Sequence, residues 1–136
     1  MSKPTESTEP NEPRPLTPVE LELMQHVWRL GEASVADVLA ALPAERQLAY
    51  TSVSTVLRIL EQKGVVKSRK VGRGHLYAAE LPREAYEAQT VRHLVDTLFE
   101  GEPGALVARL VEAVPLAPED VERLRTLLAA KKGGRR

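Results

Sequence analysis

Residues 48–80 constrain the fold more than any other stretch, because three local patterns follow one another there. From Tyr50 to Lys63, Val and Leu recur at the three- and four-residue spacing of a helix face. Gly64 then provides a C-terminal stop. Two short runs rich in β-branched and aromatic residues flank the sequence VGRG, a pattern typical of two strands joined by a turn. This stretch therefore predicts a helix followed by a β-hairpin.

Two further helices are predicted before this stretch. Thr17 is a suitable N-cap, Glu20 completes a capping box, and Gly31 marks the end of the first helix. Ser34 caps a second, shorter helix that Pro43 stops. Three helices followed by a two-stranded hairpin are the winged variant of the helix-turn-helix. The predicted fold class is mainly α (α+β), with a helical arm after the winged domain.

The arm is predicted from apolar stripes at helical spacing that begin after Pro82. These stripes have no place in a small winged-helix core, so they need another surface to pack against. They could form an intramolecular core, but a two-fold mate is the commonest solution, and we expect a homodimer. The expected interface residues are Val91, Leu94, Val95, Leu98, Phe99, Leu106, Leu110, Val121, Leu124 and Leu128.

Composition divides the chain into four parts. Residues 1–15 are rich in Pro, Glu, Ser and Thr and are expected to form a disordered arm. Residues 16–81 are assigned to the winged-helix domain, 82–130 to the helical dimerisation region, and 131–136 to a basic tail. There is no cysteine, no long apolar run and no apolar segment of a signal peptide near the N-terminus. We therefore expect a cytoplasmic protein without a membrane partner.

Charge is distributed unevenly, although the formal net charge is zero. Six Lys and Arg stand against one Glu between residues 50 and 77, whereas residues 81–130 carry five Arg against nine Asp and Glu. A locally basic surface matters more for DNA than the sum over the chain. The winged segment is thus the expected site of contact with double-stranded DNA.

A helical wheel places small hydroxyls and one Arg on the face of the third helix opposite its Val and Leu residues. Such a face can approach base edges and phosphates closely, although small polar residues could also simply solvate an exposed helix. The basic hairpin tip favours DNA, and Gly72 and Gly74 let the turn adopt positive φ and come close to a backbone. The expected DNA-binding residues are Tyr50, Thr51, Ser52, Ser54, Thr55, Arg58, Arg69, Lys70, Arg73 and His75.

Catalytic and metal-binding patterns are absent from the sequence. His26, His75 and His93 lie far apart and fit no ligand spacing such as HExxH. Ser52 and Ser54 have no neighbouring His or Lys that could serve as a base. We therefore expect no catalytic residues, no metal, no cofactor and no enzymatic activity.

The segment AYTSVSTVLRILEQKGVVKSRKVGRGHLY is similar to the helix-and-wing signature of the BlaI/MecI/CopY penicillinase-repressor family. The resemblance extends back through LTPVELELMQHVW and forward through LVDTLFEGEPGALVARLVE. It implies a homodimeric winged-helix repressor that binds inverted-repeat operators near promoters, with the C-terminal helices as the dimer arm. The alternative interpretation is a winged-helix module that binds proteins, but such modules usually lose the basic wing that this chain keeps.

The sequence departs from the family pattern in three respects. Ile59 stands where the family often has Arg, with Arg58 just before it, so the operator sequence cannot be carried over. The copper-responsive branch has a C-terminal cysteine cluster, and this chain has no cysteine. The β-lactam-responsive branch is induced by proteolysis at an Asn-Phe bond, and Arg109-Leu110 occupies the matching position. The resemblance thus implies a regulatory protease or other inducing system as a partner, without its cleavage rule.

Overall fold

The computed structural model describes residues 15–134 of the chain. Most of the predicted N-terminal arm (1–14) and the last two residues of the predicted basic tail (135–136) lie outside the described residues. The chain divides into two compact units, with the boundary between Arg92 and His93. The assignment of residues 16–81 and 82–130 to separate domains stays a prediction, since the first unit continues past residue 82 into the next helix.

The first two helices of the first unit begin at capping boxes. Helix α1 (Pro18–Leu30) follows Thr17, whose hydroxyl accepts from the Glu20 N–H at 3.2 Å while its own N–H donates to the Glu20 carboxylate at 3.0 Å. Helix α2 (Val35–Ala41) has the same arrangement between Ser34 and Asp37. Because each box satisfies N–H groups that lack a partner inside the helix, both starts are fixed locally, as the sequence predicts.

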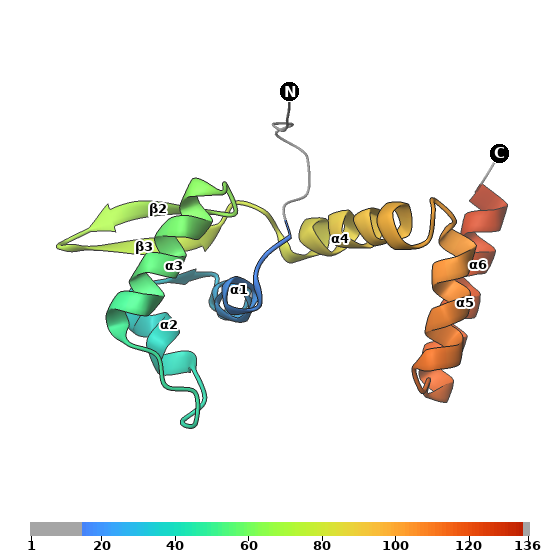
Figure 1. Ribbon diagram of the computed structural model, residues 1–136, viewed down its shortest axis with the longest axis horizontal. Coiled ribbons are helices and arrows are strands. Elements are labelled where there is room, and N and C mark those ends of the chain that lie inside the picture. The colour runs from blue at the N-terminus through green and yellow to red at the C-terminus, as the bar shows by residue number, and fades with distance from the viewer. Residues whose placement is uncertain (1–14, 135–136) are drawn as a thin grey trace. The chain divides into compact units, whose positions relative to one another are not determined.

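Helix α3 (Tyr50–Gln62) packs its apolar face into the core of this unit. Val53, Leu57 and Leu60 are fully buried, and Val56 is half-buried. The helix ends before Gly64, which adopts a φ of 81° that glycine tolerates without steric cost. Helices α1, α2 and α3 pack against one another and lie beside the hairpin, in the arrangement of a winged helix (Figure 1). The predicted fold class is confirmed.

The hairpin belongs to a sheet of three strands, one more than the sequence predicted. Strands β2 (Val66–Val71) and β3 (Gly74–Ala79) pair antiparallel, and β1 (Glu32–Ala33) pairs with the other edge of β3. A strand of two residues is too short to show a period in the sequence. Of the two turn glycines only Gly72 has a positive φ, at 60°, as in a type II′ turn. Gly74 is the first residue of β3 and has no positive φ, because a turn of this type needs it only at the first central residue.

The core of the first unit is small and mostly aliphatic. Its buried members are Leu23, Met24, Val27, Ala33, Val35, Val38, Val53, Leu57, Leu60, Val65, Val66 and Tyr77. Trp28 lies half-buried at the edge, where its indole N–H donates to the Leu81 carbonyl at 3.0 Å. The Arg83 guanidinium lies 4.9 Å from the centre of a Trp28 ring, and the Tyr86 ring lies 5.8 Å away. These contacts attach the start of the next helix to α1.

The remaining helices expose most of their apolar residues. Helix α4 (Arg83–Leu98) crosses the boundary between the units, and α5 (Pro103–Ala113) and α6 (Pro118–Gly134) belong to the second. No side chain of α4 or α5 is buried. Helices α5 and α6 lie side by side (Figure 1). The predicted helical stripes are therefore confirmed as helices, and they leave an apolar surface open to solvent.

Candidate nucleic-acid interface

The outward face of α3 presents the polar side chains that the sequence placed there. Thr51, Ser52, Thr55 and Arg58 are exposed. Tyr50 is 56% exposed, and Ser54 is half-buried at the flank of the same helix. These side chains point away from the core because the Val and Leu residues on the opposite face of α3 pack into it.

The first turn of α3 lacks the side-chain cap that α1 and α2 have. Its N-cap residue, Ala49, makes no side-chain hydrogen bond, and no acidic residue stands in the first turn. The N–H groups at this end therefore keep their donor capacity, and the helix dipole gives them a partial positive charge. A phosphate or another anion is the group that such a helix end attracts.

Strand alternation divides the basic residues of the hairpin between two faces. The Ser68 hydroxyl donates to the Glu61 carboxylate of α3 at 2.8 Å, so the face that carries Ser68 is turned toward α3. Lys70 lies two residues further along the same strand and pairs with His75 across the ladder, which puts both on this face. Arg69 pairs with Leu76 on the opposite face.

A polar groove of about 350 Å³ lies between α3 and the hairpin. Its lining residues are Ser54, Arg58, Glu61, Ser68, His75 and Tyr77. Burial of the Tyr77 phenol, together with the nearby Glu61 charge, raises the pKa of Tyr77, so this hydroxyl stays neutral. The groove brings three of the predicted DNA-binding residues together, namely Ser54, Arg58 and His75.

The exposed cations of this unit differ in whether a carboxylate holds them. In the described part of the chain, Arg58, Lys70 and Arg73 form no ion pair. Arg69, in contrast, makes two hydrogen bonds to Glu32 of β1, from Nε at 2.7 Å and from Nη2 at 3.1 Å. Hydrogen bonding from this guanidinium lowers the pKa of the Glu32 carboxyl, so the pair is charged at neutral pH. Arg69 is thus separated from the other predicted contacts by its face and by its partner.

Sequence reasoning missed Glu61, Ser68, Tyr77 and Glu32. The alternation of the strands could have placed Ser68 and Tyr77 on the face toward α3, given the correct register. Nothing local indicates Glu32, because its strand is only two residues long and lies far from Arg69 in the sequence. Within residues 15–134, no group of three potential metal ligands occurs, and no helix is long and apolar enough to cross a membrane.

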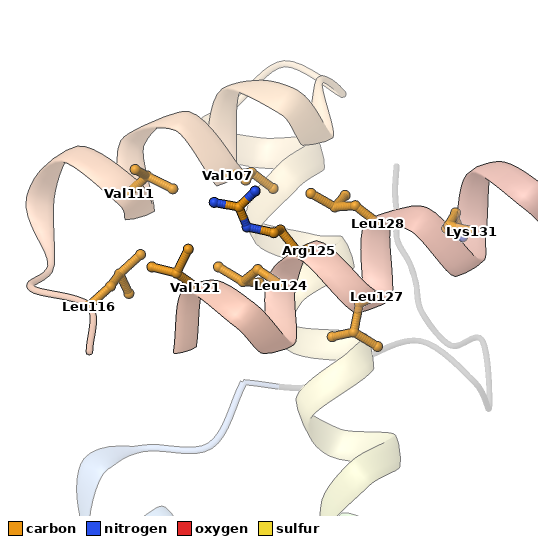
Figure 2. A pocket seen from close by; sticks show the side chains of 9 residues that line it. All are labelled: Val107, Val111, Leu116, Val121, Leu124, Arg125, Leu127, Leu128 and Lys131. Atoms are coloured by element: carbon orange, nitrogen blue, oxygen red, sulfur yellow. The ribbon is translucent and has the colours of Figure 1, made fainter. Parts of the chain in front are cut away.

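The second unit carries an apolar groove of about 410 Å³ between α5 and α6. Figure 2 shows its lining, to which Val107, Val111, Leu116, Val121, Leu124, Arg125, Leu127, Leu128 and Lys131 contribute. Three predicted interface residues line it, namely Val121, Leu124 and Leu128. The others are distributed along the helices: Leu94, Leu98 and Leu110 are exposed, Val95, Phe99 and Leu106 are half-buried, and Val91 is exposed in the first unit.

The family model described as "Penicillinase repressor" matches residues 16–130. The transcriptional regulator BlaI of Mycobacterium tuberculosis is 35% identical over 119 residues, which cover 85% of this chain and 84% of the relative. The methicillin resistance regulatory protein MecI of Mammaliicoccus sciuri is 22% identical over 116 residues, covering 85% of this chain and 94% of the relative. The solution structure of the DNA-binding domain of the repressor BlaI is 24% identical, with a TM-score of 0.47, and covers 52% of this chain and 87% of that one.

The family match spans most of the chain, and this protein belongs to the penicillinase repressor family. The resemblance stated from the sequence is thereby confirmed. The protein is a transcriptional repressor, and the prediction that it is not an enzyme is confirmed by its family.

Proposed function

We propose that this member of the penicillinase repressor family is a homodimer that binds inverted-repeat operators near promoters in a sequence-specific manner. The observation that carries the proposal is the common orientation of Arg58, Lys70 and His75. Arg58 lies on the exposed face of α3 and lines the groove together with His75. Lys70 pairs with His75 on the hairpin face turned toward α3. One side of the first unit thus combines a polar helix face with Arg58 and Lys70, two cations that form no ion pair within residues 15–134.

The α3 face is suited to the major groove of DNA. Its exposed hydroxyls are small enough for close approach, and they donate to bases or to phosphates with little discrimination. Arg58 forms no ion pair in residues 15–134, so its guanidinium is available for bidentate contact with guanine. The uncapped N-terminus of α3 would add a phosphate contact. The other residues of α3 that the sequence predicts to contact DNA are Tyr50, Thr51, Ser52, Ser54 and Thr55.

The hairpin would serve as the wing on neighbouring phosphates. Arg73 is exposed at its tip, and Lys70 lies one rung away on the side of α3. Contacts with phosphates carry no base information, but they fix the register of the helix in the groove. Each such contact also makes the affinity more dependent on salt. The sequence assigned Arg69 to the same role, but in the structure its guanidinium is bound to Glu32.

A second copy of the chain would supply the other half-site. The second unit exposes an apolar surface over α5 and α6, with Val121 38% and Leu128 61% exposed. Burial of such a surface against its symmetry mate is the usual reason for two-fold assembly. Two weak half-sites joined in one dimer bind at high effective concentration. Occupancy of a promoter by the dimer would deny the site to polymerase, and a regulatory protease or other inducing system would relieve this block.

Fluorescence anisotropy tests the DNA proposal. Labelled duplexes tile the region upstream of the protein's own gene, with a scrambled duplex as competitor, at about 150 mM salt because affinity depends on salt. We expect one tile to bind at least about a thousandfold more tightly than the scrambled duplex. Equal weak binding to every tile and to genomic fragments would favour the protein-interaction alternative.

Two variants with the same change in net charge test whether this binding uses the proposed surface. The R58A/R73A variant removes two positive charges from the α3 face and the wing, and we expect it to lose binding to the selected tile. The R29A/R92A variant removes two exposed charges elsewhere in the first unit and should bind like the wild type. Equal loss in both variants would mean that only overall charge matters, which contradicts the proposed contacts.

A further inference from the structure

The wing sheet contains a bidentate ion pair that spans all three of its strands. Glu32 of β1 lies opposite Ala78 of β3, and Ala78 lies opposite Lys67 of β2. Arg69 is two residues beyond Lys67 on the same face, so its side chain reaches back across β3 to meet the Glu32 carboxylate. Both carboxylate oxygens accept, which is the strongest arrangement available to an arginine and a carboxylate.

This pair occupies one of the two edges through which the Arg69 guanidinium could bind a phosphate, and the Glu32 charge offsets its positive charge. A phosphate, like a carboxylate, binds the planar guanidinium through two parallel N–H groups. Nε and Nη2 of Arg69 already donate to Glu32. The guanidinium is also drawn toward β1, the strand remote from the Gly72-Arg73 turn, because β1 pairs with the opposite end of β3. One bidentate edge of the guanidinium, its charge and its position are therefore held by Glu32.

The other cations of the hairpin are not held in this way. Lys67 approaches Glu80 only to 3.7 Å, and both side chains are more than half exposed. Lys70 and Arg73 form no ion pair in the described residues. A carboxylate thus holds one selected cation of the wing in a close, two-point contact, while its neighbours stay available.

We propose that Glu32 is a positioning residue that withholds Arg69 from DNA and thereby lowers the sequence-independent affinity of the protein for duplexes. This inference rests on the proposed DNA-binding function and revises one contact within it. The wing phosphate contacts come from Lys70 and Arg73, and Arg69 makes none while Glu32 is charged. Because phosphate contacts are blind to sequence, their number sets how strongly the protein is retained on random DNA.

The test compares two variants that each remove one negative charge from the same sheet region. E32Q keeps the shape of the side chain but breaks the charge pairing with Arg69, whereas E80Q loosens only the distant contact with Lys67. Binding of the full chain to a scrambled duplex is measured by anisotropy at salt concentrations from about 50 to about 200 mM. The slope of log affinity against log salt measures the number of phosphates bound. We expect this slope to be steeper in E32Q than in E80Q by about 0.9 per bound protomer. The ratio of E32Q to E80Q affinity is then about 3.5-fold larger at the low end of this range for each additional phosphate bound.

Arginine substitutions separate release of Arg69 from a general increase in positive charge. R69A in the wild-type background should leave the salt slope unchanged, whereas R73A should make it shallower by about 0.9 per protomer. R69A in the E32Q background should abolish the increase in slope that E32Q produces. The R69A and R73A measurements do not depend on the folding of E32Q, and circular dichroism with thermal melting checks the fold of each variant.

Two results would overturn the inference while leaving the proposed function intact. One is equal salt slopes for E32Q and E80Q, and the other is a shallower slope for R69A in the wild-type background. A wild-type protein that binds no duplex at any salt concentration would overturn the proposed function itself, and this inference with it.

Discussion

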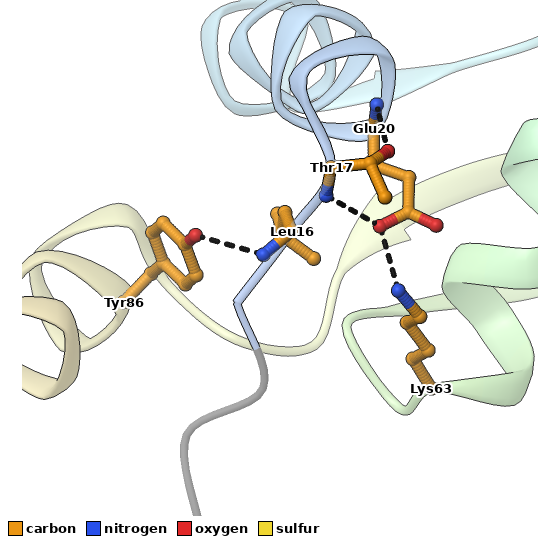
Figure 3. Close-up of polar contacts among 5 residues, drawn as sticks. All are labelled: Leu16, Thr17, Glu20, Lys63 and Tyr86. Carbon is orange, nitrogen blue, oxygen red and sulfur yellow. Dashed lines mark hydrogen bonds and ion pairs between the residues drawn. The ribbon is translucent and has the colours of Figure 1, made fainter. Parts of the chain in front are cut away.

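The Lys63 ammonium donates to Oε1 of Glu20 at 2.7 Å and so joins the end of α3 to the first turn of α1 (Figure 3). The same carboxylate oxygen accepts from the Thr17 N–H at 3.0 Å. Glu20 is 6% exposed, which makes it a charged member of an otherwise apolar core. One carboxylate therefore caps α1 and holds the C-terminal end of the helix that carries the proposed DNA-reading face.

Loss of the Lys63 charge should destabilise the first unit. K63M keeps the aliphatic length of the side chain but leaves the buried Glu20 carboxylate without its cation. We expect the free energy of unfolding in urea to fall by about 1.5–3 kcal/mol, the usual contribution of a hydrogen bond to a charged group. K67M is the matched control, because Lys67 forms only the exposed 3.7 Å contact with Glu80. It should change stability by less than about 0.5 kcal/mol, and an equal loss in both variants would refute the assigned role of the pair.

Acid should remove the same stabilisation. Burial of the Glu20 carboxyl acts to raise its pKa, but hydrogen bonds from Lys63 and Thr17 and the Lys63 charge together outweigh burial and leave the pKa below 4.5. A carboxyl whose pKa is lower in the folded state stabilises the fold above its unfolded pKa. This contribution is lost as pH falls from 4.5 through the folded pKa.

The measurement is urea unfolding of wild type and E20Q at several pH values from neutrality down to about pH 3. We expect the stability difference between the two proteins to be largest near neutrality and to shrink below pH 4.5. A difference that is constant across this range would show that the charge of Glu20 contributes nothing.

Alanine substitution of the two hairpin glycines should have different effects on stability. Gly72 has a φ of 60°, whereas Gly74 lies in β3 outside the positive-φ region, and a Cβ added at either would meet no atom within 4 Å. G72A should therefore destabilise the fold by about 1–3 kcal/mol through backbone strain alone. G74A should be neutral or stabilising by about 0.5–1 kcal/mol, since alanine loses less backbone freedom in a strand. Thermal unfolding of the two variants decides, and equal melting temperatures would contradict the observed turn.

The apolar surface of the second unit should govern association. Leu128 is 61% exposed, so an aspartate there costs the single chain little but would place a charge in the proposed dimer contact. L128D should shift the protein toward monomer in sedimentation velocity and weaken operator binding. R123D, at an exposed polar position of the same helix, is the control and should stay as associated as the wild type. A wild-type protein that sediments as a monomer at all concentrations would remove the basis of the dimer proposal.

Local features of the fold were predictable because their causes lie within a few residues. Thr17 and Glu20 are three residues apart, and this spacing alone defines the capping box that the structure contains. Val53, Leu57 and Leu60 fall on one helix face by the same kind of arithmetic, and all three are buried. The letters VGRG, in contrast, do not state which turn type closes the hairpin, so they do not tell which of the two glycines has the positive φ.

The sequence indicated which residues belong to the candidate interface, but not how they are arranged in space. Composition identified the hydroxyls of α3 and the basic hairpin, yet it gave Arg69 and Lys70 the same role. The ladder register separates them onto opposite faces, and register depends on which strands pair. Glu32 enters only because β1 docks on the far edge of β3, which brings it to Arg69 across 37 residues of sequence.

The order of the helices and the hairpin, the ends of the first helices, the faces that must be apolar and the family all follow from the amino-acid sequence. Each depends on spacings shorter than a few helical turns or on motifs read in order. The pairing of charges depends instead on the folded chain, which joins Glu20 to Lys63 across 43 residues and Glu32 to Arg69 across 37. A salt bridge needs two atoms within a few ångströms, and chain folding, not sequence separation, sets that distance.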